Sequence, residues 1–189
     1  MINRTKIYTD GACPNNGKYN ATAGYCVIIG DKYYTGRLRP NIYRYSLFKG
    51  TSKLSGENKG QLGIIETPAP ITNNRAEFLA IIIGLLYTSG PLEVVSDSKH
   101  CIQVATEWME GWYLNGYFGT TRKKNLDLIE ILHTLSRGRD IIYTWQVGHV
   151  PIPRTQNEKG NHWADKYAVE SATAVDYKMV RGDFNLNLL

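Results

Sequence analysis

The stretch Lys6-Ile7-Tyr8-Thr9-Asp10-Gly11, near the N-terminus, is a short run of β-branched and aromatic residues that ends with an acid and a glycine. Such a run predicts a β-strand that ends near Asp10. Two runs of the same kind follow at residues 24–29 and 32–38, and the Gly30-Asp31 pair between them is typical of a hairpin turn. The chain is therefore expected to begin with a three-stranded β-meander.

After the meander the sequence alternates between helical and strand patterns. Helices are predicted over residues 74–87, 98–112, 125–137 and 161–171, and strands over residues 92–96 and 141–147. The first of these helices is apolar on nearly every face from Ala76 onward, which indicates a central buried helix. The alternation predicts an α/β fold with a five-stranded mixed sheet flanked by helices in the order βββαβαβα.

Length and composition narrow the class of protein. The chain has 189 residues, a net charge of +5 and a pI near 9.0, which favours one domain and a polyanionic partner if the charges cluster. Its longest apolar stretch, residues 78–87, is shorter than the roughly 20 residues that span a bilayer. The N-terminus lacks the apolar core of a signal peptide, so we expect an intracellular protein, cytoplasmic by default. The three cysteines support neither a disulfide framework nor a zinc site.

The pattern of alternating elements is interrupted once and then ends. From residue 39 to about 70 it dissolves into Tyr, Lys, Ser and Gly, which indicates an insertion. After residue 171 no clear period remains. We therefore expect one domain over residues 1–171, with an insertion at about 39–70, and a C-terminal tail at 172–189.

Four carboxylates occupy positions where burial is expected, namely Asp10, Glu77, Asp97 and Asp165. Neighbouring parallel strands lie about 4.8 Å apart, so Asp10 and Asp97 can point to one spot if their strands are adjacent. Two carboxylates about 5 Å apart repel by about 3 kcal/mol at an effective dielectric near 20, and a divalent cation relieves this. An all-oxygen ligand set favours Mg²⁺, or Mn²⁺ in its place, over Zn²⁺. The matching chemistry is phosphodiester hydrolysis by a two-metal-ion mechanism.

Each of these acids also has a structural explanation. Asp10-Gly11 fits a turn that ends a strand, and Asn74 with Glu77 fits a capping box. Asp97-Ser98 fits an N-cap, and Asp165 fits an acid near a helix N-terminus. For any single residue the two interpretations stay open, and it is the four together that favour a metal site.

Five stretches in this order resemble type 1 ribonuclease H, of the ribonuclease H-like superfamily. They are Tyr8-Thr9-Asp10-Gly11, Thr72-Asn73-Asn74-Arg75-Ala76-Glu77, Ser96-Asp97-Ser98, Gly148-His149, and Gly160-Asn161 with Ala164-Asp165. The resemblance implies the ribonuclease H-like fold. It also implies that the RNA strand of an RNA–DNA hybrid is cut to leave 5′-phosphate and 3′-hydroxyl ends.

The resemblance gives each catalytic position a role. It implies that Asp10, Glu77, Asp97 and Asp165 hold two Mg²⁺ ions and that His149 helps in proton transfer or product release. The ordinary pKa range of histidine suits that role. The alternative is a solvent-facing loop histidine, since the loop from His149 to Asp165 is longer than usual for the family.

The resemblance also implies how the two strands of a hybrid are held. Residues that match RNA-strand contacts of the family are Cys13, Asn16, Asn73, Asn74 and Lys99. Thr72 and Asn115 match its DNA phosphate pocket, and Trp108 and Trp112 match the aromatic residues of its DNA channel. The alternative for both tryptophans is core packing. Residues 115–118 and 122–124 are interpreted as a basic protrusion, with a solvated charge run as the alternative.

The sequence departs from the family pattern at three places. Pro70 stands where an arginine often clamps the DNA phosphate, and Tyr113-Leu114 replaces a basic pair in the protrusion. The insertion is the third departure, and our hypothesis is that its lysines and arginines contact the hybrid. Few residues precede the first strand, so no separate N-terminal hybrid-binding module is expected.

Two alternatives to a ribonuclease H stay open. One is another nuclease of the ribonuclease H-like superfamily, and the other is a catalytically silent module that binds hybrids. The resemblance implies no protein partner, and we expect a monomer.

Overall fold

The structure, a computed structural model, describes residues 2–38, 43–46, 63–66, 70–116, 124–174 and 180–184. Its strands are β1 (Thr5–Ala12), β2 (Ala23–Ile29), β3 (Lys32–Leu38), β4 (Tyr43–Ser46), β5 (Gly63–Glu66), β6 (Leu92–Ser96), β7 (Ile141–Trp145) and β8 (Val180–Asp183). Its helices are α1 (Asn73–Leu86), α2 (Lys99–Gln103), α3 (Met109–Leu114), α4 (Leu126–Ser136) and α5 (Gln156–Thr173), with a π-helical segment, Val104–Trp108, between α2 and α3.

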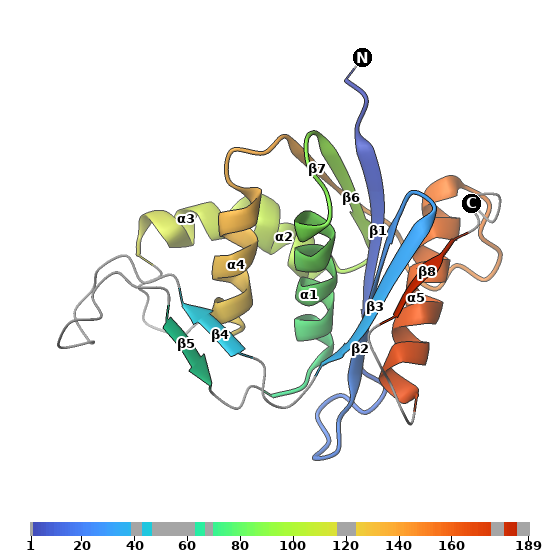
Figure 1. Ribbon diagram of the computed structural model, residues 1–189, viewed down its shortest axis with the longest axis horizontal. Coiled ribbons are helices and arrows are strands. Elements are labelled where there is room, and N and C mark those ends of the chain that lie inside the picture. Colours follow the sequence, from blue (N-terminus) through green and yellow to red (C-terminus); the bar gives the residue numbers. More distant parts are fainter. Residues whose placement is uncertain are drawn as a thin grey trace.

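The main sheet has the strand order β7-β6-β1-β2-β3-β8 (Figure 1). β1, β2 and β3 form the predicted antiparallel meander, while β6 runs parallel to both β1 and β7. The predicted α/β fold with a mixed sheet is therefore confirmed. The sheet has one strand more than the five predicted, because β8 pairs with the outer edge of β3. β8 lies in the tail at 172–189, and its four residues are too few to show a period in the sequence.

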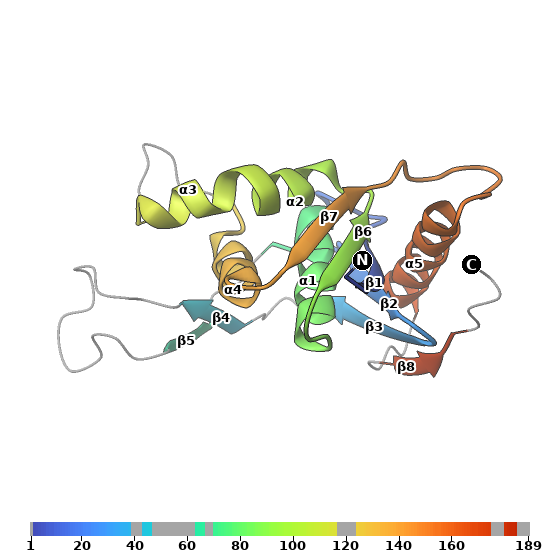
Figure 2. The same ribbon diagram turned by 90° about the horizontal axis from the view of Figure 1, so that it is seen from above.

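Helices cover both faces of this sheet (Figure 2). On one face α1 packs against β1 and β2, with α4 beside it, and on the other face α5 packs against the same two strands. Phe78, Ile81 and Leu85 of α1 are buried together with Ile7 of β1 and Val94 of β6. The prediction that this helix is central and buried is confirmed.

The backbone of β2 touches α5 directly. A Cβ atom on Gly24 would lie 2.0 Å from Oγ of Ser171, so a glycine is needed where the strand and the helix meet. The Ser171 hydroxyl is hydrogen bonded to the carbonyl oxygens of Gly36, at 3.2 Å, and Ala168, at 2.8 Å. These contacts fix the height of α5 over the sheet, and with it the position of Asp165.

Two of the four predicted helices differ from the structure by more than one residue at one or both ends. α5 begins at Gln156 rather than at 161, because Thr155 and Glu158 form a capping box that starts the helix within the predicted loop. The helix predicted over 98–112 is divided into α2, the π-helical segment and α3. Among the helices that the structure describes, none is long and apolar enough to cross a membrane.

β4 and β5 lie within the predicted insertion. They pair antiparallel with each other in a separate two-stranded sheet, and β4 lies against α4 (Figure 1). The rest of the insertion lies outside the described residues.

A buried ion pair joins α1 to α4. The guanidinium of Arg75 donates to both carboxylate oxygens of Asp127, at 3.0 and 2.6 Å. Their side chains are 3% and 6% exposed, so each charge depends on the other. Removing one partner from such a pair typically costs about 3–5 kcal/mol. The sequence analysis did not identify this pair.

Candidate active site

Two of the predicted carboxylates stand at the same edge of the sheet. β1 and β6 are parallel neighbours, and their register pairs Tyr8 with Val95. Asp10 and Asp97 each lie two residues further along the chain, at the carboxyl ends of adjacent strands. Strand adjacency was the condition under which the sequence predicted that these two acids meet.

Close packing of α1 on β1 brings Glu77 to the same place. A Cβ atom on Gly11 would lie 2.2 Å from the backbone nitrogen of Glu77, so glycine is needed for this approach. Oxygen atoms of Asp10, Glu77 and Asp97 lie within 4.8 Å of one another. Asp10 is 4% exposed and Glu77 is 5% exposed, so water can solvate little of their charge.

Asp165 and His149 lie beside this cluster. Asp165 lines the same cleft as the other three acids, although it lies outside the group of three whose oxygens are within 4.8 Å. Nδ1 of His149 is 3.7 Å from Oδ2 of Asp165, and the His149 side chain is 80% exposed. His149 therefore faces solvent, as the alternative interpretation states, and also stands next to a predicted site residue.

The acids line a cleft of about 680 Å³, formed where β1, α1, α2 and α5 meet. Its lining combines acids, amides, cations and small residues: Asp10, Gly11, Ala12, Cys13, Pro14, Asn73, Glu77, Asp97, Ser98, Lys99, His100, His149, Asp165 and Val169. The cleft is open to solvent and large enough for part of a polymeric ligand.

Burial dominates the electrostatics of this cluster. It raises the pKa of Asp10 well above its usual value, and the neighbouring carboxylates, Glu77 first, raise it further. Burial and then the charge of Asp97 likewise raise the pKa of Glu77. A hydrogen bond from Nδ2 of Asn73 to Oε1 of Glu77, at 3.3 Å, acts in the opposite direction. Asp10 and Glu77 therefore hold protons more tightly than ordinary carboxylates do, and a cation would displace those protons.

The structural explanations for Asp10 and Glu77 are wrong. β1 runs through Asp10 to Ala12, so no turn ends the strand at Asp10. The N-cap of α1 is Thr72, whose side chain accepts from the backbone N–H of Arg75. Asn74 therefore lies inside the helix and forms no capping box with Glu77.

The structural explanation for Asp165 is wrong as well, and the N-cap expected at Asp97-Ser98 is formed by Ser98 alone. Ser98 is the residue that caps α2, by accepting from the backbone N–H of Cys101, so Asp97 stands before the cap. Asp165 lies in the middle of α5, far from the N-terminal turn in which a helix dipole acts. The local structure of the chain thus does not account for acids at Asp97 and Asp165, both of which are half-buried.

Two residues of the family stretches, for which the sequence predicted no role, lie against the Asp97 carboxylate. Nδ2 of Asn161 donates to Oδ2 of Asp97 at 3.3 Å, and Asn161 is 2% exposed. A Cβ atom on Gly148 would lie 2.1 Å from the same oxygen, so no side chain fits there. The signal for Asn161 was its spacing, because a residue four positions before Asp165 shares its helical face.

The residues predicted to contact the RNA strand lie at or near the cleft. Cys13, Asn73 and Lys99 line it. Oδ1 of Asn16 accepts the backbone N–H of Asn73 at 3.3 Å, which ties the loop after β1 to the start of α1. Asn74 is exposed in the first turn of α1. The contacts of these residues with RNA stay predictions.

The residues predicted to contact the DNA strand are spread more widely. The rings of Trp108 and Trp112 lie 5.9 Å apart, and both pack, partly buried, against the larger hydrophobic cluster. The two rings are thus neighbours, and both also contribute to the core. Thr72 caps α1, whereas Asn115 follows α3, where its side-chain amide donates to the carbonyl oxygen of Gly111 at 2.9 Å.

Asn125, which was not among the residues selected from the sequence, contacts the side chain of Arg75, a residue of the first turn of α1. Oδ1 of Asn125 accepts from the guanidinium of Arg75 at 3.4 Å, and Oγ1 of Thr72 accepts the backbone N–H of Arg75, also at 3.4 Å. Asn125 has a φ of 58°, which asparagine tolerates better than most residues. Asn125 therefore contacts the end of the Arg75 side chain, while the side chain of Asn115 is held by α3.

The predicted basic protrusion is described only at its edges. Residues 117–123 lie outside the described residues, and Lys124 is exposed. The guanidinium of Arg137 lies 5.3 Å from the centre of the Tyr113 ring, so a cation after α4 stands beside the position where the family has a basic pair.

Comparison with known proteins identifies the family. The fold, with acids at the carboxyl ends of adjacent parallel strands, is ribonuclease H-like. The model of the RNase H family matches residues 3–173. A "Ribonuclease H" of Methylorubrum extorquens is 32% identical over 169 residues, which cover 87% of this chain and 58% of that protein. The chain belongs to the ribonuclease H family, as its resemblance to type 1 ribonuclease H predicts.

Two further similar proteins agree with this placement. A "Ribonuclease H" of Schizosaccharomyces pombe is 31% identical over 172 residues, which cover 90% of this chain and 53% of that protein. The chain thus spans a little over half the length of these two curated relatives. The crystal structure of LC9-RNase H1, a type 1 RNase H with the type 2 active-site motif, matches with a TM-score of 0.65 and 18% identity, covering 99% of this chain and 81% of that one. At this identity the match supports the fold alone.

Proposed function

We propose that this protein is an endonuclease that hydrolyses the RNA strand of RNA–DNA hybrids and leaves 5′-phosphate and 3′-hydroxyl ends. The observation that carries the proposal is the cluster of Asp10, Glu77 and Asp97 in an open cleft. Carboxylate oxygen atoms of these three residues lie within 4.8 Å of one another. Family membership supplies the substrate class. One domain over residues 1–171 would perform the reaction, and the strand β8 of the tail would complete its sheet.

The residues of the cluster fit a pair of divalent cations. Their donor atoms are all carboxylate oxygens, which suits Mg²⁺ or Mn²⁺. Oε2 of Glu77 is buried and has no hydrogen-bond partner among the described residues, so the site contains an acceptor that still needs a positive partner. Asp10, Glu77, Asp97 and Asp165 would hold the ions. Bound there, the ions would supply an activated water and stabilise the charge that develops on the leaving oxygen.

The protein's own side chains would orient the reacting groups. Asn73 holds one oxygen of Glu77, and Asn161 holds one oxygen of Asp97. His149, exposed next to Asp165, would carry a proton to or from the cleft or assist product release.

Residues around the cleft would hold the hybrid. We propose that Cys13, Asn16, Asn73, Asn74 and Lys99 approach the RNA strand, because they lie at or near the acids. Contacts with 2′-hydroxyl groups would distinguish RNA from DNA. Trp108 and Trp112 would line the path of the DNA strand, and Thr72 and Asn115 would bind a DNA phosphate.

A cleavage panel tests the proposal. The protein is incubated with Mg²⁺ and, in parallel, with a matched hybrid, duplex RNA, duplex DNA and each single strand. We expect cleavage confined to the RNA of the hybrid, with products that carry a 5′-phosphate. Cleavage of duplex DNA would indicate another nuclease of the superfamily, and hybrid binding without cleavage would indicate a silent binding module. Either outcome would contradict the proposal.

A further inference from the structure

The end of β7 places one indole ring next to the acid cluster. β7 is parallel to β6, with Trp145 opposite Ser96, and the backbone N–H of Gln146 donates to the carbonyl oxygen of Ser96 at 2.9 Å. Trp145 therefore stands beside the residue that precedes Asp97. It is 43% exposed and belongs to none of the hydrophobic clusters formed by the described residues. Core packing thus does not account for a tryptophan at this position.

The indole makes two contacts with the turn that carries Asp97. Its N–H donates to the backbone carbonyl oxygen of Asp97 at 3.1 Å. Its ring face lies under the ammonium group of Lys99, with Nζ 4.2 Å from the ring centre. A cation over an indole face at this distance is attracted to it. One side chain therefore contacts both an acid of the cluster and a cation that lines the cleft.

Asn161 holds the Asp97 carboxylate, whereas the indole is what contacts the Asp97 carbonyl oxygen and the Lys99 ammonium among the described residues. Ser96 and Ser98 hold the backbone through their hydroxyl groups, at 3.1 Å to the N–H of Ser98 and 3.4 Å to the N–H of Cys101. Neither reaches the Asp97 carbonyl or the Lys99 ammonium. Lys99 is an exposed residue with a long, flexible side chain. A ring that already holds this side chain in place reduces the conformational entropy that the lysine loses when it binds an anion.

We propose that Trp145 is a positioning residue for the reaction, acting on Asp97 through its indole N–H and on Lys99 through its ring face. The first contact keeps the Asp97 carboxylate aligned with Asp10 and Glu77. The second holds the Lys99 ammonium at the cleft, ready for a phosphate of the RNA strand. The inference rests on the proposed function, because its readouts are hybrid cleavage and hybrid binding.

Two substitutions separate these contacts. Trp145→Phe keeps an aromatic face but removes the N–H. We expect kcat to fall by about three- to tenfold, the value of one hydrogen bond, while the Kd for hybrid stays unchanged. Trp145→Leu removes both contacts. We expect the same fall in kcat together with an increase in Kd of about two- to fivefold. Kd is measured in EDTA, where it does not depend on turnover.

A double-mutant cycle shows whether the ring acts through Lys99. Lys99→Ala is combined with Trp145→Leu, and the Kd for hybrid is measured for the four proteins. We expect Trp145→Leu to leave Kd unchanged once Lys99 is absent. If its effect on Kd is the same in both backgrounds, the ring does not act through Lys99 and the proposal is wrong in that part.

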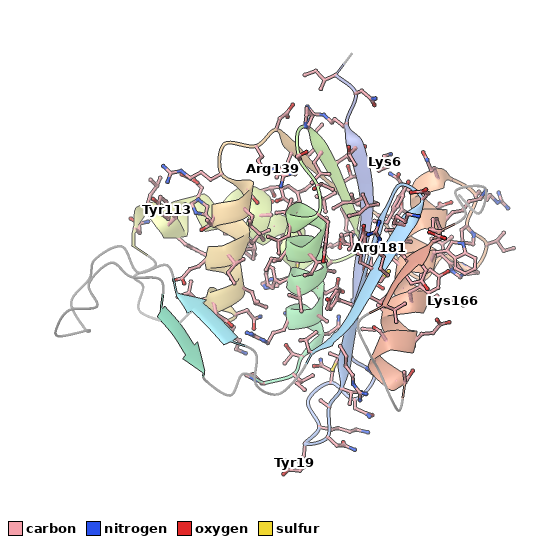
Figure 3. The ribbon with its side chains drawn as sticks, in the orientation of Figure 1. Lys6, Tyr19, Tyr113, Arg139, Lys166 and Arg181 are labelled. Atoms are coloured by element: carbon pink, nitrogen blue, oxygen red, sulfur yellow. The ribbon has the colours of Figure 1, made fainter. Side chains whose placement is uncertain are left out.

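Trp163 provides a matched control. Lys166 lies 4.6 Å from the centre of the Trp163 ring, on α5, on the opposite side of the sheet from α1 (Figure 3). Trp163 packs against Tyr167 and Phe184 and not against the acid cluster. Trp163→Phe should leave kcat and Kd unchanged.

The outcomes distinguish the inference from the function on which it rests. Wild-type protein that cleaves hybrids, with Trp145→Phe at wild-type kcat, overturns the positioning role and leaves the proposed function intact. Wild-type protein that cleaves no hybrid overturns the function itself. If Trp145→Leu does not fold, Trp145→Phe, whose thermal melt is checked first, decides the role through the kcat that we expect to fall.

Discussion

Asn161 donates its side-chain amide to Oδ2 of Asp97 across 3.3 Å, in a position where the asparagine is 2% exposed. The contact joins α5, which carries Asp165, to the residue that directly follows β6. An asparagine that is buried here gives the carboxylate a neutral donor, and so orients it without cancelling the charge that a cation would need.

The first prediction concerns this contact. Asn161→Asp keeps the size of the side chain but replaces the donor with an acceptor that bears a negative charge. We expect kcat on a hybrid to fall by about 10- to 100-fold, the value of a hydrogen bond to a charged group. His162→Ala, the next residue along α5 and exposed, is the control. An Asn161→Asp protein as active as the control would show that the contact does not orient Asp97.

The second prediction concerns the charge of the cluster. Asp10→Asn should abolish cleavage, because it removes a ligand, and yet should raise the free energy of unfolding in EDTA. The increase should be on the order of 1–3 kcal/mol, since a repulsion among close carboxylates is removed. Activity and urea unfolding are measured on the same preparation. A variant that keeps activity near the wild-type value, or that is less stable in EDTA, contradicts the account.

The third prediction is a pH dependence of stability. The pKa of Asp10 and of Glu77 is raised in the folded protein, by burial and then by neighbouring carboxylates, from ordinary values of 3.8 and 4.5. Between those values and the raised ones the folded state binds more protons than the unfolded state. The contribution of these groups to stability is therefore complete below the ordinary values and is lost as the pH rises.

Urea unfolding in EDTA at several pH values checks this sign. The free energy of unfolding of the wild-type protein should fall, relative to that of Asp10→Asn, as the pH rises from about 4 toward neutrality. Mg²⁺ should reverse the trend at neutral pH, because it binds the ionised form. If the free energy of unfolding of the wild type instead increases relative to that of Asp10→Asn as the pH rises, the ionised acids do not destabilise the metal-free protein and the account is contradicted.

The fourth prediction concerns His149. Its side chain is 80% exposed and 3.7 Å from Asp165, so it is free to move a proton but is held by few contacts. His149→Ala should lower kcat without abolishing it and should leave thermal stability unchanged. Complete inactivation would mean that His149 has a different role from the one proposed.

The fifth prediction concerns the Arg75–Asp127 pair. Asp127→Ala leaves a buried guanidinium without its carboxylate and should cost about 3–5 kcal/mol of unfolding free energy. The double variant Arg75→Met with Asp127→Leu should be more stable than that single variant, because it buries no lone charge. A single variant that unfolds like the wild type would show that the pair contributes little to joining α1 and α4.

The sequence predicted the structure best where a chemically distinctive residue stands at the end of a run with a clear strand or helix pattern. Asp10 and Asp97 each follow a short β-run, and parallel pairing of the two strands brings their ends together. The apolar faces of α1 indicated its burial correctly. Glu77 and Asp165, as acids in predicted helices, were selected together with Asp10 and Asp97, and the family motifs added the role proposed for His149.

Long-range contacts account for most of what the sequence did not show. β8 has no pattern of its own and exists through pairing with β3. Asn125 accepts a hydrogen bond from Arg75, a contact across 50 residues that spacing does not reveal. The capping box at Thr155 was visible in the sequence, but the prolines just before it favoured a loop.

Calorimetric titration of Mn²⁺ into the protein tests the central claim most directly. We predict heat of binding for the wild-type protein and its loss in Asp10→Asn, with His162→Ala behaving like the wild type. Equal heats for the wild type and Asp10→Asn, or none for either, would contradict a divalent-cation site built from Asp10, Glu77 and Asp97.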